Sequence, residues 1–188
     1  MQYDCLVMPS PVGELTLVAR GDALAAILWQ DDKPTRVRLG ELREDGAHPV
    51  LLRVQQQLRE YFAGTRQQFE VPLDFAGTDF QKQVWQALLT IPFGQTRSYG
   101  EIARQIGRPA AVRAVGAANG RNPVSIIAPC HRVIGATGAL TGFAGGLEAK
   151  QTLLALEGIA LSSAQEAQKT GQATRRARQV DLAQGNLF

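Results

Sequence analysis

Apolar residues follow two different periods along this chain, and the change of period divides it into two units. Near the start they alternate with polar residues, as at Leu15, Leu17 and Ala19, and turns rich in glycine and proline separate the runs. Alternation between turn signals is typical of half-buried strands. With a third run from Leu24 to Trp29, the pattern predicts an antiparallel meander.

The spacing of apolar residues then becomes helical. Pro49 stands at the first-turn position that proline favours, and apolar residues follow at helical spacing as far as Gly64, which predicts a helix. A short strand is expected over Gln68 to Leu73. This α+β unit, residues 1–77, contains no cluster of reactive side chains, and we interpret it as a mainly structural domain.

Residues 78–161 read as a second, mainly helical unit. Thr78-x-x-Gln81 and Ser98-x-x-Glu101 are capping boxes, each of which opens a helix. A tight turn at Gly107-Arg108-Pro109 precedes a third helix, expected over Ala110 to Ala118. Two short helices joined by a turn that contains glycine are typical of the helix-turn-helix. The second of them has small side chains and one long cation, Arg113, so it either packs tightly within its own domain or lies in a nucleic-acid groove.

Composition narrows the class of protein. A chain of 188 residues that is 45% apolar can bury a core. Two cysteines and two histidines exclude a disulfide scaffold and a zinc site of three or four thiolates. No apolar run is long enough to span a bilayer, and the first residues lack the basic start and cleavage site of a signal peptide. We therefore expect a cytoplasmic protein without a membrane partner.

The charge is unevenly distributed. The net charge is −3 over residues 1–77, +4 over 78–161 and +2 over 162–188. A basic second half suggests a polyanionic partner such as nucleic acid. The alternative is a slightly basic surface without a specific partner.

Cys130 has neighbours that can change its reactivity. His131 and Arg132 follow it directly. The thiolate is the nucleophilic form of cysteine, and a nearby base or positive charge favours it. Adjacent side chains point in different directions, so these neighbours alone leave two alternatives open: a catalytic thiol, or a buried cysteine beside a structural histidine.

Two further residues, one before and one after Cys130 in the sequence, lie at positions that suggest a role. Asn122 precedes Pro123, and this pair is a turn signal. A glycine-rich loop then leads to a final helix, expected over Leu147 to Leu156. Glu157 follows that helix at a C-terminus, where the helix dipole disfavours an acid. It therefore needs a local partner, and orienting His131 is one candidate role.

The segment Pro129-Cys130-His131-Arg132-Val133 resembles the O6-alkylguanine-DNA alkyltransferases. The resemblance is strong over residues 78–158 and looser over the first unit. It implies an α+β fold, with a small N-terminal antiparallel sheet and helix of the ribonuclease H-like type and a C-terminal domain that carries a winged helix-turn-helix. The other matching segments are Phe80-Gln81-x-x-Val84-Trp85, Ser98-Tyr99, Arg113-Ala114-Val115-Gly116, Asn122-Pro123, Gly145-Gly146 and Leu153-Leu154-x-x-Glu157-Gly158.

The resemblance implies DNA repair by direct reversal. The damaged nucleotide is flipped out of double-stranded DNA, and the alkyl group of O6-alkylguanine or O4-alkylthymine passes irreversibly to Cys130. His131 would act as general base through a water, Glu157 would orient His131, and Asn122 would hold the turn before the cysteine. No cofactor and no metal are expected, and the protein is expected to act as a monomer that reacts once.

The family pattern also assigns the DNA contacts and the pocket. Where the family often has tyrosine and serine, this chain has Phe143 and Ala144, so the pocket lacks two hydroxyl groups and the range of alkyl groups stays open. The expected DNA-binding residues are Tyr99, Arg113, Ala111, Ala114 and Arg132. The expected substrate-pocket residues are Val133, Phe143, Ala144 and Gly145.

The last segment of the chain gives a separate prediction. The composition of Ser162 to Val180 is typical of a disordered linker. The end of the chain, with Gln184, Leu187 and Phe188, resembles the peptide by which bacterial repair proteins bind the sliding clamp. The alternative is a short apolar end that docks on its own domain.

Two other functions are open at this point. One is a non-catalytic sensor that flips alkylated guanine and recruits other repair factors. Relatives of that type lack the cysteine. The other is a helix-turn-helix transcription factor with a redox-reactive Cys130, which leaves Glu157 unexplained.

Overall fold

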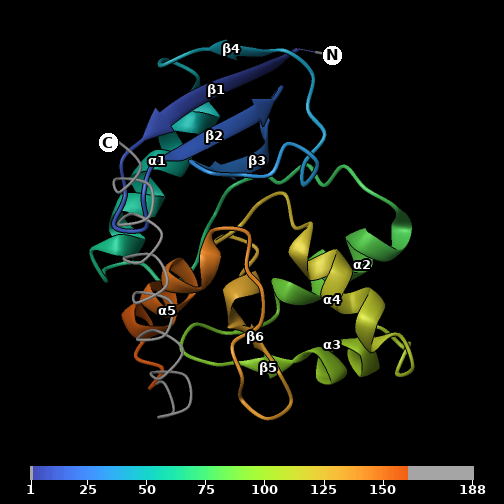
Figure 1. Cartoon of the computed structure of the whole chain (residues 1–188). Coiled ribbons are helices and arrows are strands. Elements are labelled where there is room, and N and C mark those ends of the chain that lie inside the picture. Colours follow the sequence, from blue (N-terminus) through green and yellow to red (C-terminus); the bar gives the residue numbers. More distant parts are fainter. Residues whose placement is uncertain (1, 161–188) are drawn as a thin grey trace, which may run out of the picture.

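The computed structural model describes residues 2–160 (Figure 1). The linker expected over 162–180 and the clamp-binding end at 184–188 lie outside the described residues. A sheet with one helix forms one layer of the molecule, and the helices of the second half lie beneath it in the view of Figure 1. No helix within residues 2–160 is long and apolar enough to cross a bilayer.

The first unit is a four-stranded sheet covered by one helix. The predicted meander is present, with β2 (Leu15–Arg20) pairing antiparallel to both β1 (Tyr3–Met8) and β3 (Ala23–Trp29). A fourth strand, β4 (Leu42–Glu44), pairs parallel to β1 and gives the order β3-β2-β1-β4. The sequence did not predict β4, because its three residues are all exposed and carry no alternation.

Helix α1 (Pro49–Phe62) begins at the predicted proline and covers one face of this sheet. Its buried residues recur at helical spacing, as Val50, Leu51, Val54 and Leu58, and they join the buried strand residues in one core. The amphipathic pattern therefore predicted both the element and the face it buries.

The strand expected over 68–73 is not formed. Only a single bridge, between Leu24 and Leu73, joins this segment to the sheet. The side chain of Gln57 takes the place of a neighbouring strand, because its Oε1 accepts from Glu70 N at 2.8 Å and its Nε2 donates to Glu70 O at 3.3 Å. Pro72 has no N–H to donate to a ladder. Local polar contacts therefore override the strand pattern here.

The second unit contains the predicted helix-turn-helix. Both capping boxes are present, at the N-termini of α2 (Asp79–Leu88) and α3 (Tyr99–Gln105). Helix α4 (Val112–Gly120) begins two residues after the predicted start, and its N-cap residue Ala111 makes no side-chain hydrogen bond. The elements are α2 (Asp79–Leu88), β5 (Arg97–Ser98), α3 (Tyr99–Gln105), α4 (Val112–Gly120), the 3-10 turn η1 (Cys130–Arg132), β6 (Val133–Ile134), parallel to β5, and α5 (Gly146–Leu156).

The cysteine segment is packed against the first unit. Val124, Ile126 and Ile127 precede Cys130 and belong to the same buried core as the sheet and α1. Ile27 of β3 forms a bridge with Val124, and its N–H donates to the Pro123 carbonyl at 2.8 Å. The sheet therefore fixes the position of the loop that carries the cysteine.

Candidate active site and DNA-facing helix

Cys130 is the first residue of η1 and lies at the end of a tightly held loop. The residue is 2% exposed. Within the loop, Ile126 has φ 74°, a conformation that is costly for a β-branched residue and persists only where packing enforces it. Ile126 is fully buried in the core shared with the sheet. Strained backbone near a reactive group indicates a functional constraint.

Asn122 closes the loop from within. Its Nδ2 donates to the Ala128 carbonyl at 2.7 Å, and its Oδ1 accepts from Val124 N at 3.1 Å. Arg36, from the loop after β3, donates to the Asn122 carbonyl and is paired with Asp32. Asn122 therefore joins the two ends of the loop between α4 and the cysteine.

His131 and Glu157 meet in the interior. His131 Nε2 lies 2.7 Å from Glu157 Oε1, and both side chains are fully buried. Glu157 is the C-cap residue of α5. The unfavourable position of an acid at this helix end is therefore explained by the local partner that the sequence analysis anticipated.

Glu157 accepts hydrogen bonds from four residues. Besides His131, Tyr61 Oη donates to Oε1 at 2.7 Å, and Gly94 N donates to Oε2 at 3.2 Å. Arg132 donates to both oxygens, at 2.8 and 3.0 Å. Burial raises the pKa of this carboxyl, but the hydrogen bonds from His131 and Arg132 outweigh it and lower the pKa to about 2. Glu157 is therefore a carboxylate at neutral pH.

An ionised Glu157 determines which His131 nitrogen carries the proton. A carboxylate only accepts hydrogen bonds, so the hydrogen lies on Nε2 and the lone pair lies on Nδ1. Burial lowers the pKa of His131, which keeps the ring neutral at neutral pH. Nδ1 is buried and has no hydrogen-bond partner among residues 2–160. His131 can therefore accept a proton at Nδ1.

The thiol of Cys130 needs such a base. Burial raises its pKa, and the nearby Asn122 amide, the Ser125 hydroxyl and the charge of Lys150 only oppose that rise. A cysteine that rests as the thiol becomes a nucleophile when a neighbouring group takes its proton. A thiol followed by an imidazole that is hydrogen-bonded to a carboxylate is the set of groups that a catalytic triad contains.

Arg132 does not lie where the sequence analysis expected it. It was predicted to bind DNA, but it is 6% exposed. Its guanidinium holds both oxygens of Glu157, donates to the Ile91 carbonyl at 2.6 Å and lies over the Phe93 ring. A guanidinium whose donors are used inside the protein is not available to phosphates. Arg132 is therefore not a DNA contact; it belongs to the hydrogen-bond network of the Glu157 carboxylate.

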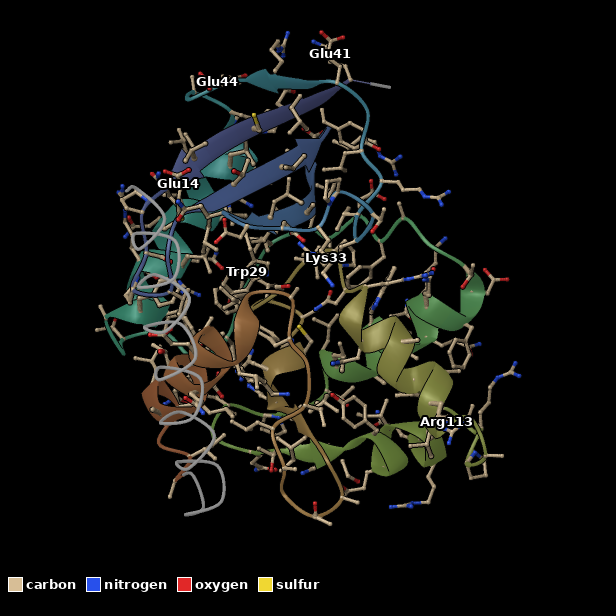
Figure 2. The ribbon with its side chains drawn as sticks, viewed as in Figure 1. Glu14, Trp29, Lys33, Glu41, Glu44 and Arg113 are labelled. Atoms are coloured by element: carbon tan, nitrogen blue, oxygen red, sulfur yellow. The ribbon has the colours of Figure 1, made fainter. Side chains whose placement is uncertain are left out.

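The other expected DNA contacts lie on or beside α4. Arg113 and Ala114 are exposed, Ala111 is half-buried, and Arg113 projects from the helical unit on the side away from Trp29 (Figure 2). Val115 and Ala118, on the opposite side of α4, are buried in the hydrophobic core of the helical unit. The helix thus presents a face of small residues with one cation at its start.

A cavity of about 600 Å³ lies between α4 and the glycine-rich loop. Tyr99, Arg113, Phe143 and Ala144 line it together, and Tyr99 Oη lies 2.6 Å from Thr141 Oγ1. Tyr99 and Phe143 also pack against the buried cluster that contains Cys130. Val133 and Gly145, the other two expected pocket residues, do not line this cavity: Val133 is fully buried, and the backbone of Gly145 lies against the Trp29 ring.

Sequence reasoning missed several residues that build the site. Lys150 is fully buried in α5, and its Nζ donates to the carbonyls of Val133 at 2.6 Å and Thr141 at 3.3 Å. Burial lowers its pKa to about 8. A lysine on the apolar face of a helix was the available signal. Tyr61 gave none, because its helical spacing marked it only as a core residue.

The fold and the site define a class: a DNA-binding protein of the helix-turn-helix type with a buried cysteine nucleophile. Residues 5–75 match the family model described as 6-O-methylguanine DNA methyltransferase, ribonuclease-like domain. Residues 79–159 match the one described as 6-O-methylguanine DNA methyltransferase, DNA binding domain. The chain belongs to the 6-O-methylguanine DNA methyltransferase family.

Individual relatives agree with this assignment. A methylated-DNA–protein-cysteine methyltransferase of Mycobacterium leprae is 54% identical over 153 residues, which are 81% of this chain and 91% of that protein. The constitutive methyltransferase of that name from Bacillus subtilis is 48% identical over 156 residues, covering 80% of this chain and 92% of that protein. The crystal structure of Mycobacterium tuberculosis OGT in complex with DNA is similar with a TM-score of 0.75 at 50% identity, covering 84% of this chain and 92% of that one.

Proposed function

We propose that this protein repairs alkylated DNA by irreversible, single-turnover transfer of the alkyl group from O6-alkylguanine, and from O4-alkylthymine, to Cys130. It is a methylated-DNA–protein-cysteine methyltransferase in this proposal, and it uses no cofactor. The observation that carries the proposal is the buried Glu157–His131 pair, at 2.7 Å, directly beside the cysteine. Family membership and the names of the relatives support the same reaction.

The transfer is a displacement at the alkyl carbon. The Cys130 proton passes through a water to His131 Nδ1, while Glu157 stabilises the positive charge that forms on the ring. The sulfur–carbon bond forms as the carbon–O6 bond breaks, and the electron pair of that bond stays on the guanine. The purine takes up a proton and becomes unmodified guanine, which stays in the DNA. The thioether on Cys130 is stable, so each molecule reacts once.

DNA reaches this buried thiol by nucleotide flipping. A base inside the duplex cannot approach a residue that is 2% exposed, so the lesion must leave the stack. The small residues of α4, among them Ala114, allow close approach to the minor groove, and Arg113 fills the gap left by the flipped base. Tyr99 contacts the flanking phosphate in this proposal. Phe143 then stacks on the base in the cavity.

Intact-protein mass spectrometry tests the reaction. The protein is mixed with duplex DNA that carries one O6-methylguanine, beside the Cys130→Ala variant. We expect a gain of one CH₂ unit that maps to Cys130 and is absent from the variant. Tight binding to the lesion without a mass change would contradict the proposal and favour the non-catalytic sensor. An oxidised Cys130 without transfer would favour the redox-reactive transcription factor.

We further propose that the protein acts as a monomer in the cytoplasm and binds the bacterial sliding clamp through Gln184, Leu187 and Phe188. The support for clamp binding is the sequence of this end alone, since it lies outside the described residues. Deletion of residues 184–188 should abolish capture of the clamp in a pull-down and leave alkyl transfer intact. Unchanged capture would contradict the clamp proposal.

A further inference from the structure

Trp29, the last residue of β3, contacts three residues of the second unit, two in the glycine-rich loop and one in the loop before Cys130. Its ring forms a T-shaped contact with Phe143, with centroids 5.3 Å apart. The Gly145 backbone lies so close to it that a Cβ atom there would stand 2.6 Å from the ring. Its Nε1 donates to Ser125 Oγ at 3.4 Å. Figure 2 shows Trp29 where the sheet meets the helical unit, so it is a direct connection from the first unit to the site.

Ser125 links this contact to the nucleophile. The residue is fully buried in the loop before Cys130, and its Oγ lies 3.9 Å from Cys130 Sγ, within hydrogen-bonding distance for sulfur. The other site residues do not explain a hydroxyl here, because Asn122 holds the loop and His131 supplies the base. A buried hydroxyl between an indole and a thiol therefore needs its own account.

The chemistry of the three groups determines the direction of the hydrogen bonds. The indole N–H of Trp29 can only donate, so it occupies an acceptor position of the Ser125 hydroxyl. While Cys130 is a thiol, its S–H donates to Ser125 Oγ at 3.9 Å; once that proton has left, the hydroxyl hydrogen is free to point at the sulfur. A thiolate is an acceptor, whereas a thiol competes as a donor, so this arrangement favours the charged form of Cys130.

We propose that Ser125 donates a hydrogen bond to the Cys130 thiolate, and that Trp29 is the positioning residue that orients the Ser125 hydroxyl for it. The sheet of the first unit thereby contributes to the reactivity of a nucleophile in the second. The indole-to-hydroxyl-to-sulfur relay acts before the alkyl group arrives. It deepens the proposed function and rests on it, because the thiolate it stabilises is the one that attacks.

Titration of the thiolate tests the relay without DNA. Ultraviolet absorbance of the thiolate is followed against pH, and the matching Cys130→Ala protein is subtracted to remove Cys5 and the tyrosines. Ser125→Ala should raise the pKa of Cys130 by about one unit, because it removes a hydrogen bond to a charged group. Trp29→Phe keeps an aromatic ring, removes the N–H, and should raise the pKa by about half as much.

Two comparisons separate the relay from general loosening of the core. Trp85 is the other tryptophan, is also buried, and donates to the Ala118 carbonyl at 2.9 Å, so Trp85→Phe should leave the Cys130 titration unchanged. The double variant of Trp29→Phe and Ser125→Ala should shift the pKa no further than Ser125→Ala alone, because Trp29 acts through Ser125. Thermal unfolding confirms that each variant is folded.

Single-turnover transfer from O6-methylguanine DNA gives the second readout. Ser125→Ala should slow transfer about five- to tenfold at neutral pH and approach the parent rate at alkaline pH, as the thiolate fraction recovers. An unchanged titration, or a loss of rate that is equal at every pH, would overturn the relay. Additive shifts in the double variant would overturn the role of Trp29. If the parent protein transfers no alkyl group, the proposed function fails, whereas the titration still decides the relay.

Discussion

The carboxylate network around Glu157 and the exposed face of α4 are built in opposite ways. The Glu157 and His131 side chains are fully buried, and four residues from three segments donate to the Glu157 carboxylate. The α4 face has small side chains and one exposed cation, Arg113, for which residues 2–160 supply no hydrogen bond or ion pair that would occupy it. Chemistry at a buried thiol needs groups fixed in advance, whereas a DNA-facing surface needs groups left available.

Removing the charge of Glu157 should have the largest effect. Glu157→Gln leaves the buried guanidinium of Arg132 without its carboxylate, so we expect a loss of about 3–5 kcal/mol in the free energy of unfolding at pH 7. It also removes the acceptor that orients His131, and transfer should slow on the order of 100-fold. Urea unfolding and single-turnover kinetics measure the two effects. An exposed control with the same chemical change is Glu14→Gln.

The pH dependence of that loss follows from the direction of the pKa shift. The pKa of Glu157 in the folded protein is about 2, below its ordinary value. A carboxyl with a depressed pKa contributes stability that is fully present above the unfolded pKa of roughly 4.3, and the contribution is lost as the pH falls through 2. The difference between the parent and Glu157→Gln should therefore be constant from pH 5 to pH 7 and shrink by about 3 kcal/mol toward pH 2. A difference that stays constant to pH 2 would contradict this assignment.

The helices could be predicted from the sequence, whereas the carboxylate network around Glu157 could not. The helices depend on local signals: capping boxes, proline at a helix start and the spacing of apolar residues predicted α1, α2 and α3. The network depends on side chains that meet across the fold. Tyr61 and Glu157 are far apart in the chain, and nothing near Tyr61 indicates that its hydroxyl has a carboxylate partner.

The predictions that were wrong failed because of contacts that the apolar pattern of the sequence does not show. Arg132 beside Cys130 was assigned to the DNA contacts from the family resemblance, but the tertiary fold turns it inward to Glu157. The strand expected at 68–73 failed because a distant side chain, Gln57, satisfies the backbone there. Helix α4 begins two residues later than predicted, because residues 108–111 form a turn in which Ala111 N donates to the Arg108 carbonyl at 2.9 Å. Local pattern predicts elements, whereas polar contacts between distant segments need the structure.

A negative charge on the exposed face of α4 should weaken DNA binding without affecting the buried network. Ala114 is exposed, so Ala114→Glu should leave the free energy of unfolding within about 0.5 kcal/mol. Repulsion from phosphates and loss of close approach should weaken binding to duplex DNA by at least about tenfold. Fluorescence anisotropy with labelled duplex measures the affinity. Ala114→Gln has the same shape without the charge and should retain more of the binding, and equal affinity for both variants would argue against phosphates at this face.

Removing Arg113 should have a smaller and more specific effect. Arg113→Ala should lower the affinity for lesion-bearing duplex by about 1 kcal/mol, because the gap left by the flipped base is no longer filled. Stability should be unchanged, because the side chain is exposed. The matched control is Arg53→Ala, which removes the same charge from the exposed side of α1. Similar losses for both variants would mean that only overall charge matters.

Adding a hydroxyl group to the pocket should have the smallest effect on the transfer rate. This change tests whether the cavity wall takes part in the chemistry or only provides room for the base. Phe143 and Ala144 line the cavity beside Tyr99. Ala144→Ser adds one hydroxyl near the leaving oxygen and should speed methyl transfer by a few-fold at most, since one neutral hydrogen bond contributes about 1 kcal/mol. Ala144→Val adds similar bulk without a hydrogen bond and should slow transfer of larger alkyl groups more than methyl. Competition between O6-methylguanine and O6-benzylguanine duplexes measures both. If serine and valine act alike, the cavity selects by size and Ala144 contributes only room.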